Sequence, residues 1–184
     1  MKDVIKGNVY VLGDDIDTDA IIPAQYLNLS HTNPAQKDEL ASYALSGLAE
    51  GSIPFIPKGE CRTPYKIIIG GKNFGCGSSR AQAPGCLNAA GVEAIVAEYY
   101  ARIFFRNSVN AGLLLPLESE KRLCDEVKTG DLLEIIISEQ RIIDHTRKCE
   151  YAIKPVGAVK DILEAGSVFA YAKQKLGLIH NNKL

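Results

Sequence analysis

The chain has 184 residues, of which 46% are hydrophobic and 23% are charged, and its formal net charge is -1 at pH 7. A chain of this length buries roughly two thirds of the surface of its unfolded form, so the composition excludes a disordered or fibrous protein and favours one domain over residues 1–184. The near-neutral charge removes the electrostatic basis for non-specific binding, so we expect no nucleic acid and no membrane among its partners.

The N-terminal sequence and the cysteines indicate the compartment. No apolar signal core follows Met1, and no apolar run approaches the ~20 residues that a membrane span needs. The five cysteines are an odd number without a C-x-x-C pair, which argues against a disulfide framework and a zinc site. No three of them are spaced closely enough to hold an iron-sulfur cluster. We therefore expect a cytoplasmic protein with reduced thiols that binds no metal or other cofactor by itself.

The first predicted elements are a strand over residues 8–12 and an acidic loop over residues 13–19. The loop carries four carboxylates within six residues, which could bind a hard cation through oxygen atoms. Alternatively, its Asp and Thr side chains cap turns and the element that follows, and this interpretation is favoured. Pro23 then excludes an ordinary central strand in residues 20–27.

The next segment, about residues 28–62, is polar, irregular and rich in proline. It contains one helical interval over residues 36–48, for which Gly47 or Gly51 would be the C-terminal cap. Long loops inside compact domains tend to be functional. We therefore expect an insertion that acts as a lid or contacts a partner.

Two crossover units follow. Residues 66–69 are apolar without alternation, which predicts a strand covered on both faces. A helix over residues 81–90, with Pro84 in its first turn and Gly91 as its cap, leads to a strand over residues 92–97. Strand, helix and strand within about thirty residues predict a parallel βαβ unit with a right-handed crossover.

The second unit consists of a helix over residues 100–110, which ends at Gly112, and a strand over residues 113–117. One side of this helix is expected to carry Ile103, Phe104 and Val109. Residues 132–138 and 141–143 then predict a β-hairpin. An amphipathic helix over residues 161–176 is expected to close the domain. Its N-cap would be Asp161, and its inward-facing residues would be Ile162, Phe169 and Ala170 or Leu176.

The loop from Gly70 to Arg80 has the layout of an anion site. Four glycines follow an apolar strand, and the loop ends where a helix begins, so backbone N–H groups and the helix N-terminus can face a phosphate or carboxylate. Neither nucleotide-binding pattern is present, because Arg80 stands in place of the last glycine of G-x-G-x-x-G and the Gly-Lys-Ser/Thr ending is absent. Cys76 is either an activated thiol or a small residue in a tight turn, and the turn is favoured.

Arg80 is the residue of this loop with the clearest functional signal. Its charge opposes the dipole of the helix that starts there, which favours recognition of a carboxylate. One of Ser78 and Ser79 is expected to be the N-cap of that helix. The chain has three histidines that form no Ser-His-Asp pattern, so the residues alone do not predict a serine nucleophile. Arg102 and Arg106 lie four apart and either reach the same site or remain exposed.

Three segments together resemble a known family. Residues 14–23 read DDIDTDAIIP, residues 71–80 read GKNFGCGSSR and residues 101–107 read ARIFFRN. They look like the signature segments of the small subunit of 3-isopropylmalate dehydratase, which is similar to the swivelling C-terminal domain of aconitase. The resemblance extends from about residue 5 to residue 175 in the same order.

The resemblance implies a three-layer β/β/α swivelling domain of the α/β class, with parallel βαβ units and a β-hairpin. It also implies a large partner subunit that carries a [4Fe-4S] cluster, and a small hydroxy dicarboxylic acid as substrate. In this family water is eliminated and added again in the other orientation, which moves the hydroxyl group by one carbon. The metal acts as a Lewis acid toward the hydroxyl and a carboxylate, and a serine takes the proton from the neighbouring carbon.

The resemblance also assigns site residues. Ser78 matches the base, Ser79 a residue that holds the substrate and Arg80 the carboxylate clamp. The loop that would stabilise the serine alkoxide comprises Gly75, Cys76 and Gly77. The segment that resembles the specificity loop comprises Tyr26, Leu27, Asn28 and Leu29. It has two leucines and no arginine, which favours isopropylmalate over homocitrate-like substrates.

One position departs from the family pattern. Ser-Ser-Arg is usually followed by Glu-His, and here Ala81 and Gln82 follow. The alternatives are therefore a small subunit of a related dehydratase for 2-methylmalate (citraconate), 2,3-dimethylmalate or homoaconitate. A non-catalytic carboxylate-binding or assembly module is the alternative from a different functional class.

Overall fold

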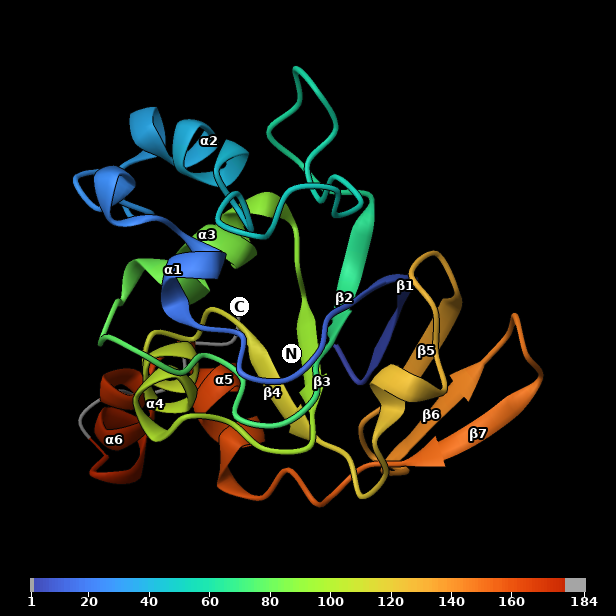
Figure 1. The fold of residues 1–184 in the computed structure, drawn as a ribbon. Coiled ribbons are helices and arrows are strands. Elements are labelled where there is room, and N and C mark those ends of the chain that lie inside the picture. The colour runs from blue at the N-terminus through green and yellow to red at the C-terminus, as the bar shows by residue number, and fades with distance from the viewer. Residues whose placement is uncertain (1, 178–184) are drawn as a thin grey trace.

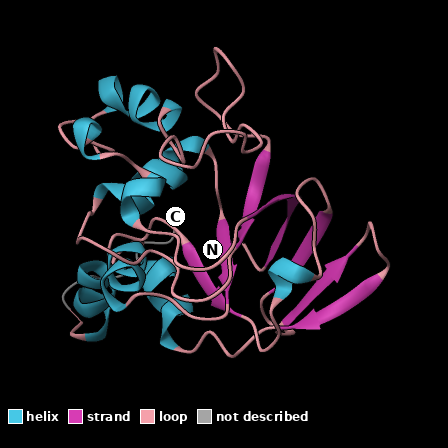
Figure 2. Ribbon diagram, in the orientation of Figure 1, coloured by secondary structure: helices cyan, strands magenta, loops and turns pink. Residues whose placement is uncertain are grey.

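The strands form one mixed sheet in the computed structural model, which describes residues 2–177 (Figures 1 and 2). Their order is β4-β3-β2-β1-β5-β6-β7. The strands are β1 (Val4–Val11), β2 (Tyr65–Ile69), β3 (Ala94–Ala97), β4 (Leu115–Glu118), β5 (Leu132–Ile136), β6 (Arg141–Asp144) and β7 (Cys149–Ala152). The α-helices are α1 (Thr18–Ile21), α2 (Pro34–Ser42), α3 (Gln82–Ala90), α4 (Arg102–Asn110), α5 (Ala158–Ala165) and α6 (Val168–Lys175). Short 3-10 helices span Ala24–Tyr26 and Leu123–Asp125.

The strands β1 to β4 form the parallel half of the sheet. Each neighbouring pair among them is parallel. The helix α3 connects β2 to β3 and α4 connects β3 to β4, which confirms the two predicted βαβ units. Every residue of β3 is buried, as expected for a strand covered on both faces. The predicted cap Gly91 ends α3 with a φ of 110°.

The strands β5 to β7 form the antiparallel half. The pairing of β5 with β6 confirms the predicted hairpin, and β7 is a third strand that the sequence analysis missed. The strand β5 alternates buried with half-buried residues, so it turns one face to the core. It joins the parallel half by pairing with residues 4–8 of β1, and residues 4–7 extend the predicted strand toward the N-terminus.

Two hydrophobic cores lie on opposite faces of the parallel strands. On one face, Ile68 and Ile95 pack with Leu87 of α3 and Phe104 of α4. On the other face, the core that contains Ile67 also contains residues of β5, β6 and β7. Figure 1 shows α1 to α4 on one side of β1 to β4 and the strands β5 to β7 on the other. The continuous sheet thus folds over itself into the expected β/β/α layers.

The helix expected over residues 36–48 is shorter than predicted. It starts at Pro34, ends at Ser42 and has Tyr43 as its C-cap, so neither Gly47 nor Gly51 caps it. Its N-cap is Asn33, whose side chain accepts a hydrogen bond from the Ala35 N–H.

The expected closing helix over residues 161–176 is two helices. Gly166 has a φ of 85°, which ends α5, and the Ser167 side chain caps α6 by accepting from the Ala170 N–H. Asp161 therefore lies inside α5 and caps nothing. The expected inward positions are wrong for Phe169, which is 76% exposed, and for Leu176, which is 72% exposed. Similarly, Ile103 of α4 is 48% exposed, while Phe104 and Val109 are buried.

Candidate active site

The candidate site lies where β1, β2 and β3 end. Parallel strands bring their carboxyl ends to the same edge of a sheet, which is where α/β proteins usually bind ligands. The loops that follow the strands are joined there by backbone hydrogen bonds. The Gly71 N–H donates to the Gly13 carbonyl (2.9 Å), and the Glu98 N–H donates to the Gly71 carbonyl (3.1 Å). The Phe74 N–H donates to the Tyr99 carbonyl (3.1 Å). The three signature segments are therefore neighbours.

The glycine loop is packed tightly against the acidic loop and α4. Gly75 and Gly77 have φ angles of 77° and 90°, which favour glycine. A Cβ built at Gly75 would lie less than 3.0 Å from atoms of the Phe104 ring, which is closer than nonbonded atoms approach in proteins. The N–H groups of Gly75 and Cys76 both donate to the carbonyl of Ile16 (2.7 and 3.2 Å). These two donors hold the loop in place and are not directed at a ligand.

The backbone N–H groups of residues 77–80 differ from those of Gly75 and Cys76. Among the described residues, the backbone N–H groups of residues 77–80 have no hydrogen-bond partner. They immediately precede α3, and Gly77, Ser78 and Ser79 are exposed. Consecutive free N–H groups before a helix suit an anion, so residues 77–80 are the part of the loop that can receive one.

The two serines do not cap α3. Its N-cap is Ala81, which makes no side-chain cap hydrogen bond, so the expectation that Ser78 or Ser79 fills this role is wrong. The chain reaches the helix with Ala81 already in helical conformation, two residues beyond Ser79. The Ser78 Oγ instead lies 3.3 Å from the Oγ1 of Thr18. Both serine hydroxyls are thus left available for other chemistry.

Arg80 is held in position by one of its nitrogen atoms. Its Nη1 donates to the Oδ1 of Asp19 (2.6 Å) and to the carbonyl of Ile22 (2.9 Å). Only 12% of the Arg80 side chain is exposed. Its Nε and Nη2 make no hydrogen bond within the described residues, so two N–H-bearing atoms remain for a carboxylate.

The four aspartates of the acidic loop have structural partners. Asp14 accepts hydrogen bonds from the Lys72 N–H (2.8 Å) and from the Arg122 side chain (2.5 Å). The bond from Arg122 has the larger effect, and both lower the pKa of the Asp14 carboxyl from its usual value. Asp17 is the side-chain N-cap of α1. The capping interpretation is therefore confirmed for Asp17. Asp15 accepts from Asn73 and Asp19 accepts from Arg80, so these two carboxylates join the loop to neighbouring segments. The described residues contain no group of three His, Cys, Asp or Glu that could hold a metal ion.

The expected specificity segment lies against α3. The Gln82 side chain donates to the carbonyl of Leu27 (3.1 Å), which ties the segment to the first residue of the helix. Tyr26 stacks on Tyr43, with ring centroids 3.6 Å apart. Asn28 is exposed, whereas Leu29 is 7% exposed and belongs to the core. Leu29 therefore anchors the segment in the hydrophobic core.

The other candidate residues are placed as follows. Burial raises the pKa of the Cys76 thiol, and Asp17 and Asp15 act in the same direction, so the environment disfavours a thiolate. Arg102 and Arg106 are exposed and make no salt bridge within the part of the chain that the structure describes.

Sequence reasoning missed two contributors to this site. Thr18, which is 2% exposed, contacts Ser78, although the sequence suggested only a capping role for its segment. Arg122 joins the carboxylates of Asp14 and Glu98 across two loops. No local pattern marks Arg122, because its partners are distant in sequence.

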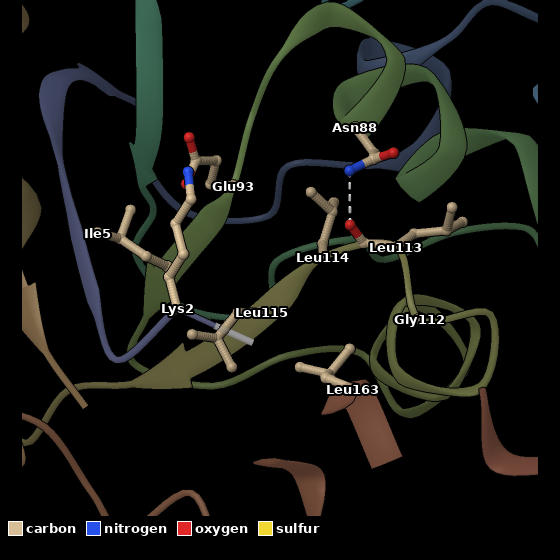
Figure 3. A pocket seen from close by; sticks show the side chains of 9 residues that line it. All are labelled: Lys2, Ile5, Asn88, Glu93, Gly112, Leu113, Leu114, Leu115 and Leu163. Atoms are coloured by element: carbon tan, nitrogen blue, oxygen red, sulfur yellow. Dashed lines mark hydrogen bonds and ion pairs between the residues drawn. The ribbon is translucent and has the colours of Figure 1, made fainter. Parts of the chain in front are cut away.

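The cavity in Figure 3 lies elsewhere. It is lined by Leu113, Leu114 and Leu115, and by Leu163 of α5. Lys2 and Glu93 also line it and form an ion pair of 3.4 Å. These residues flank the amino ends of β3 and β4, so the cavity is at the edge of the sheet opposite to Ser78.

Comparisons with known proteins identify the family. Residues 13–122 match the family described as the aconitase C-terminal domain. The small subunit 1 of 3-isopropylmalate dehydratase from Arabidopsis thaliana is 53% identical over 94% of this chain and 70% of its own length. The methanogen homoaconitase small subunit of Methanocaldococcus jannaschii is 39% identical over 94% of this chain and 93% of its own.

A solved structure supports the same assignment. The crystal structure of 3-isopropylmalate dehydratase from Methanocaldococcus jannaschii has a TM-score of 0.77 and 36% identity, covering 95% of this chain and 96% of that chain. The overall fold thus agrees with the sequence match. The chain therefore belongs to the aconitase C-terminal domain family, together with the small subunits of 3-isopropylmalate dehydratase.

Proposed function

We propose that this chain is the small subunit of a heteromeric hydro-lyase that interconverts 2-isopropylmalate and 3-isopropylmalate by dehydration and rehydration, in leucine biosynthesis. The observation that carries the proposal is the arrangement of Ser78 and Arg80. An exposed serine hydroxyl and a guanidinium with two free nitrogen atoms stand beside four free backbone N–H groups. The arrangement lies within the residues that match the aconitase C-terminal domain.

In the proposed reaction Ser78 is the base, after its hydroxyl proton has been lost to solvent. Its alkoxide takes the proton from the carbon next to the carbinol carbon, and the C–H electron pair forms the double bond as the hydroxyl group leaves with its own bonding pair. Re-addition on the other carbon reverses these steps and returns the proton from Ser78. The N–H groups of residues 77–80 and the charge of Arg80 stabilise the alkoxide, because preorganised donors in a water-poor site favour developing negative charge.

Ser79 and Arg80 would hold a substrate carboxylate. The Nε and Nη2 of Arg80 match the two oxygens of that group, and Asp19 and the Ile22 carbonyl fix the guanidinium through Nη1. Two hydrogen bonds from a fixed plane orient the substrate, which places its carbon next to Ser78.

The iron-sulfur cluster belongs, in this proposal, to a large partner subunit. The five cysteines of this chain are free, and no group of three potential ligands occurs among residues 2–177, so the residues present do not fit a cluster. When bound in the partner, a [4Fe-4S] cluster would supply a Lewis acid for the leaving hydroxyl. Relatives named as small subunits support a large-subunit partner. Ser78 is exposed here, and the partner would cover it and exclude water.

No α-helix in the described residues is long and apolar enough to span a bilayer.

We also propose that residues 28–62 face the large subunit, as an insertion in the single domain. Their inner side is anchored, because α2 packs on α3 and the Cys86 thiol donates to the Leu40 carbonyl (3.0 Å). Their outer side presents Ile53, which is 56% exposed.

The substrate assignment rests on the segment Tyr26–Leu29. Its exposed part has no cationic side chain for a third carboxylate, which suits the isopropyl group. A related substrate is the second candidate, because a relative at 39% identity is named for homoaconitase and Gln82 departs from the usual family residue. 2-Methylmalate (citraconate), 2,3-dimethylmalate and homoaconitate are therefore included in the test.

The test is reconstitution with the large subunit of the same organism and an assay on these substrates and isopropylmalate. We expect the highest kcat/KM for isopropylmalate and a loss of at least about 100-fold in kcat for Ser78→Ala. Ser138→Ala, on the β5–β6 turn, is the control and should retain activity. Full activity of Ser78→Ala would refute the role of Ser78, and co-purification without activity on any substrate would favour the non-catalytic module.

A further inference from the structure

Thr18 is a buried residue whose hydroxyl contacts Ser78 in the glycine loop. It is the first residue of α1 and is 2% exposed. Its Oγ1 donates to the carbonyl of Ser78 (3.1 Å) and lies 3.3 Å from the Oγ of the same serine. Its backbone N–H donates to the carbonyl of Cys76 (2.9 Å), and its own carbonyl accepts from the Ile22 N–H (2.9 Å). Hydrogen bonds thus hold both the N–H and the carbonyl of Thr18, which defines the position of its hydroxyl group.

The two contacts of the hydroxyl determine which groups donate. A threonine hydroxyl has one proton and two lone pairs. While that proton is given to the Ser78 carbonyl, the contact to the Ser78 Oγ can only be one in which the serine donates. The serine proton then points toward Thr18, and the serine lone pairs point away from it.

This contact selects one side-chain conformation of Ser78. An exposed serine otherwise occupies three staggered rotamers. Among the described residues, Thr18 is the only side chain that hydrogen-bonds the Ser78 hydroxyl. The contact is also suited to the alkoxide, since rotation about the Thr18 Cβ–Oγ1 bond moves the proton from the Ser78 carbonyl to the Ser78 Oγ.

We infer that Thr18 is a positioning residue for the proposed base. It orients the Ser78 hydroxyl in the resting state and donates a hydrogen bond to the Ser78 alkoxide during proton abstraction. The inference rests on the proposed function, in which Ser78 takes the substrate proton. Its structural basis is independent, because it lies in the two distances from Thr18 to Ser78. A threonine that only completed α1 would need no hydroxyl within reach of the Ser78 Oγ.

The test compares Thr18→Val with Thr18→Ser in the complex with the large subunit. Valine keeps the shape and removes the hydroxyl, whereas serine keeps the hydroxyl. We expect Thr18→Val to lower kcat about 10- to 100-fold with KM changed less than about twofold, because one hydrogen bond to the developing charge is lost. The acid limb of the kcat–pH profile should move to higher pH, since the alkoxide loses a donor. Thr18→Ser should restore both kcat and the profile.

A matched control separates this role from a structural one. The Thr63 Oγ1 also donates to a backbone carbonyl, that of Phe55 (2.8 Å), so Thr63→Val makes the same chemical change in residues remote from Ser78 in sequence. Thermal denaturation and co-purification with the large subunit show whether each variant folds and assembles. A folded Thr18→Val with normal kcat and pH profile would overturn the inference. So would an equal loss in Thr63→Val, or a failure of Thr18→Ser to restore kcat.

The double variant distinguishes the inference from the proposed function. If Thr18 acts through Ser78, adding Thr18→Val to Ser78→Ala lowers kcat by no further factor. If the two losses multiply instead, Thr18 does not act through Ser78 and the inference fails while the base assignment stands. If Ser78→Ala alone is fully active, the base assignment fails, and with it the role of Thr18.

Discussion

Gly75→Ala is the substitution that tests most directly how the site is built. Gly75 has a φ of 77°, and a Cβ there would clash with the ring of Phe104, which is 2% exposed. The left-handed conformation costs about 1–2 kcal/mol for alanine. Displacing a packed aromatic ring costs about 1–3 kcal/mol more. We therefore expect a loss of about 2–5 kcal/mol in the free energy of unfolding.

Gly59→Ala is the matched control. Gly59 has a φ of 84°, close to that of Gly75, but nothing lies within 4 Å of a Cβ built there. This variant should lose only about 1–2 kcal/mol, the cost of the conformation. Urea denaturation followed by circular dichroism measures both values, with equal m-values as the check that the same transition is observed. Equal losses in the two variants would refute the claim that contact with Phe104 positions the glycine loop.

Three further predictions concern individual contacts. Arg80→Lys should lower kcat/KM about 100-fold or more in the assembled enzyme, because a bidentate carboxylate contact of about 1.5–3 kcal/mol per bond is lost; a change below tenfold would contradict the clamp. Gln82→Ala should raise KM about 3- to 10-fold, because it removes a bond of about 0.5–1.5 kcal/mol that holds Leu27; an unchanged KM would show that the segment needs no support. Asp14→Asn should make stability less sensitive to acid. The pKa of Asp14 lies below 3.8 in the folded state, so its contribution is present above that pH and is lost as the pH falls through the folded value. Denaturation curves from pH 6 to pH 2 measure this, and parallel losses in both proteins would contradict it.

The exposed position of the proposed site supports the expectation that the chain acts together with a partner subunit. Ser78 and Ser79 are exposed on a loop, whereas proton abstraction by an alkoxide requires that water be excluded. In the proposed function the chain supplies the base, the carboxylate clamp and the backbone donors, and residues 2–177 contain no clustered set of metal ligands. We therefore expect the isolated subunit to be inactive and to gain activity on binding its partner.

Local patterns in the sequence determined the parallel half of the fold. Non-alternating apolar runs in β2 and β3 show that both faces are covered, and Gly91 adopts a conformation that glycine favours. The C-terminal helices were not divided in the same way, because the residues from 161 to 176 were interpreted as one continuous helical pattern. The pair Gly166-Ser167 carries a local signal for the break, since glycine ends α5 in the left-handed conformation and serine caps α6.

The sequence by itself determined which residue types gather at the site, because the motif places Ser78, Ser79 and Arg80 before a helix. Only the tertiary structure decided how their atoms are used. It directs the N–H groups of Gly75 and Cys76 to Ile16, leaves those of residues 77–80 free and brings Thr18 to Ser78. The physical reason is the parallel register of β1, β2 and β3, which aligns Val11 with Ile69 and Ile69 with Val96. That pairing sets loops distant in sequence side by side, which no local pattern records.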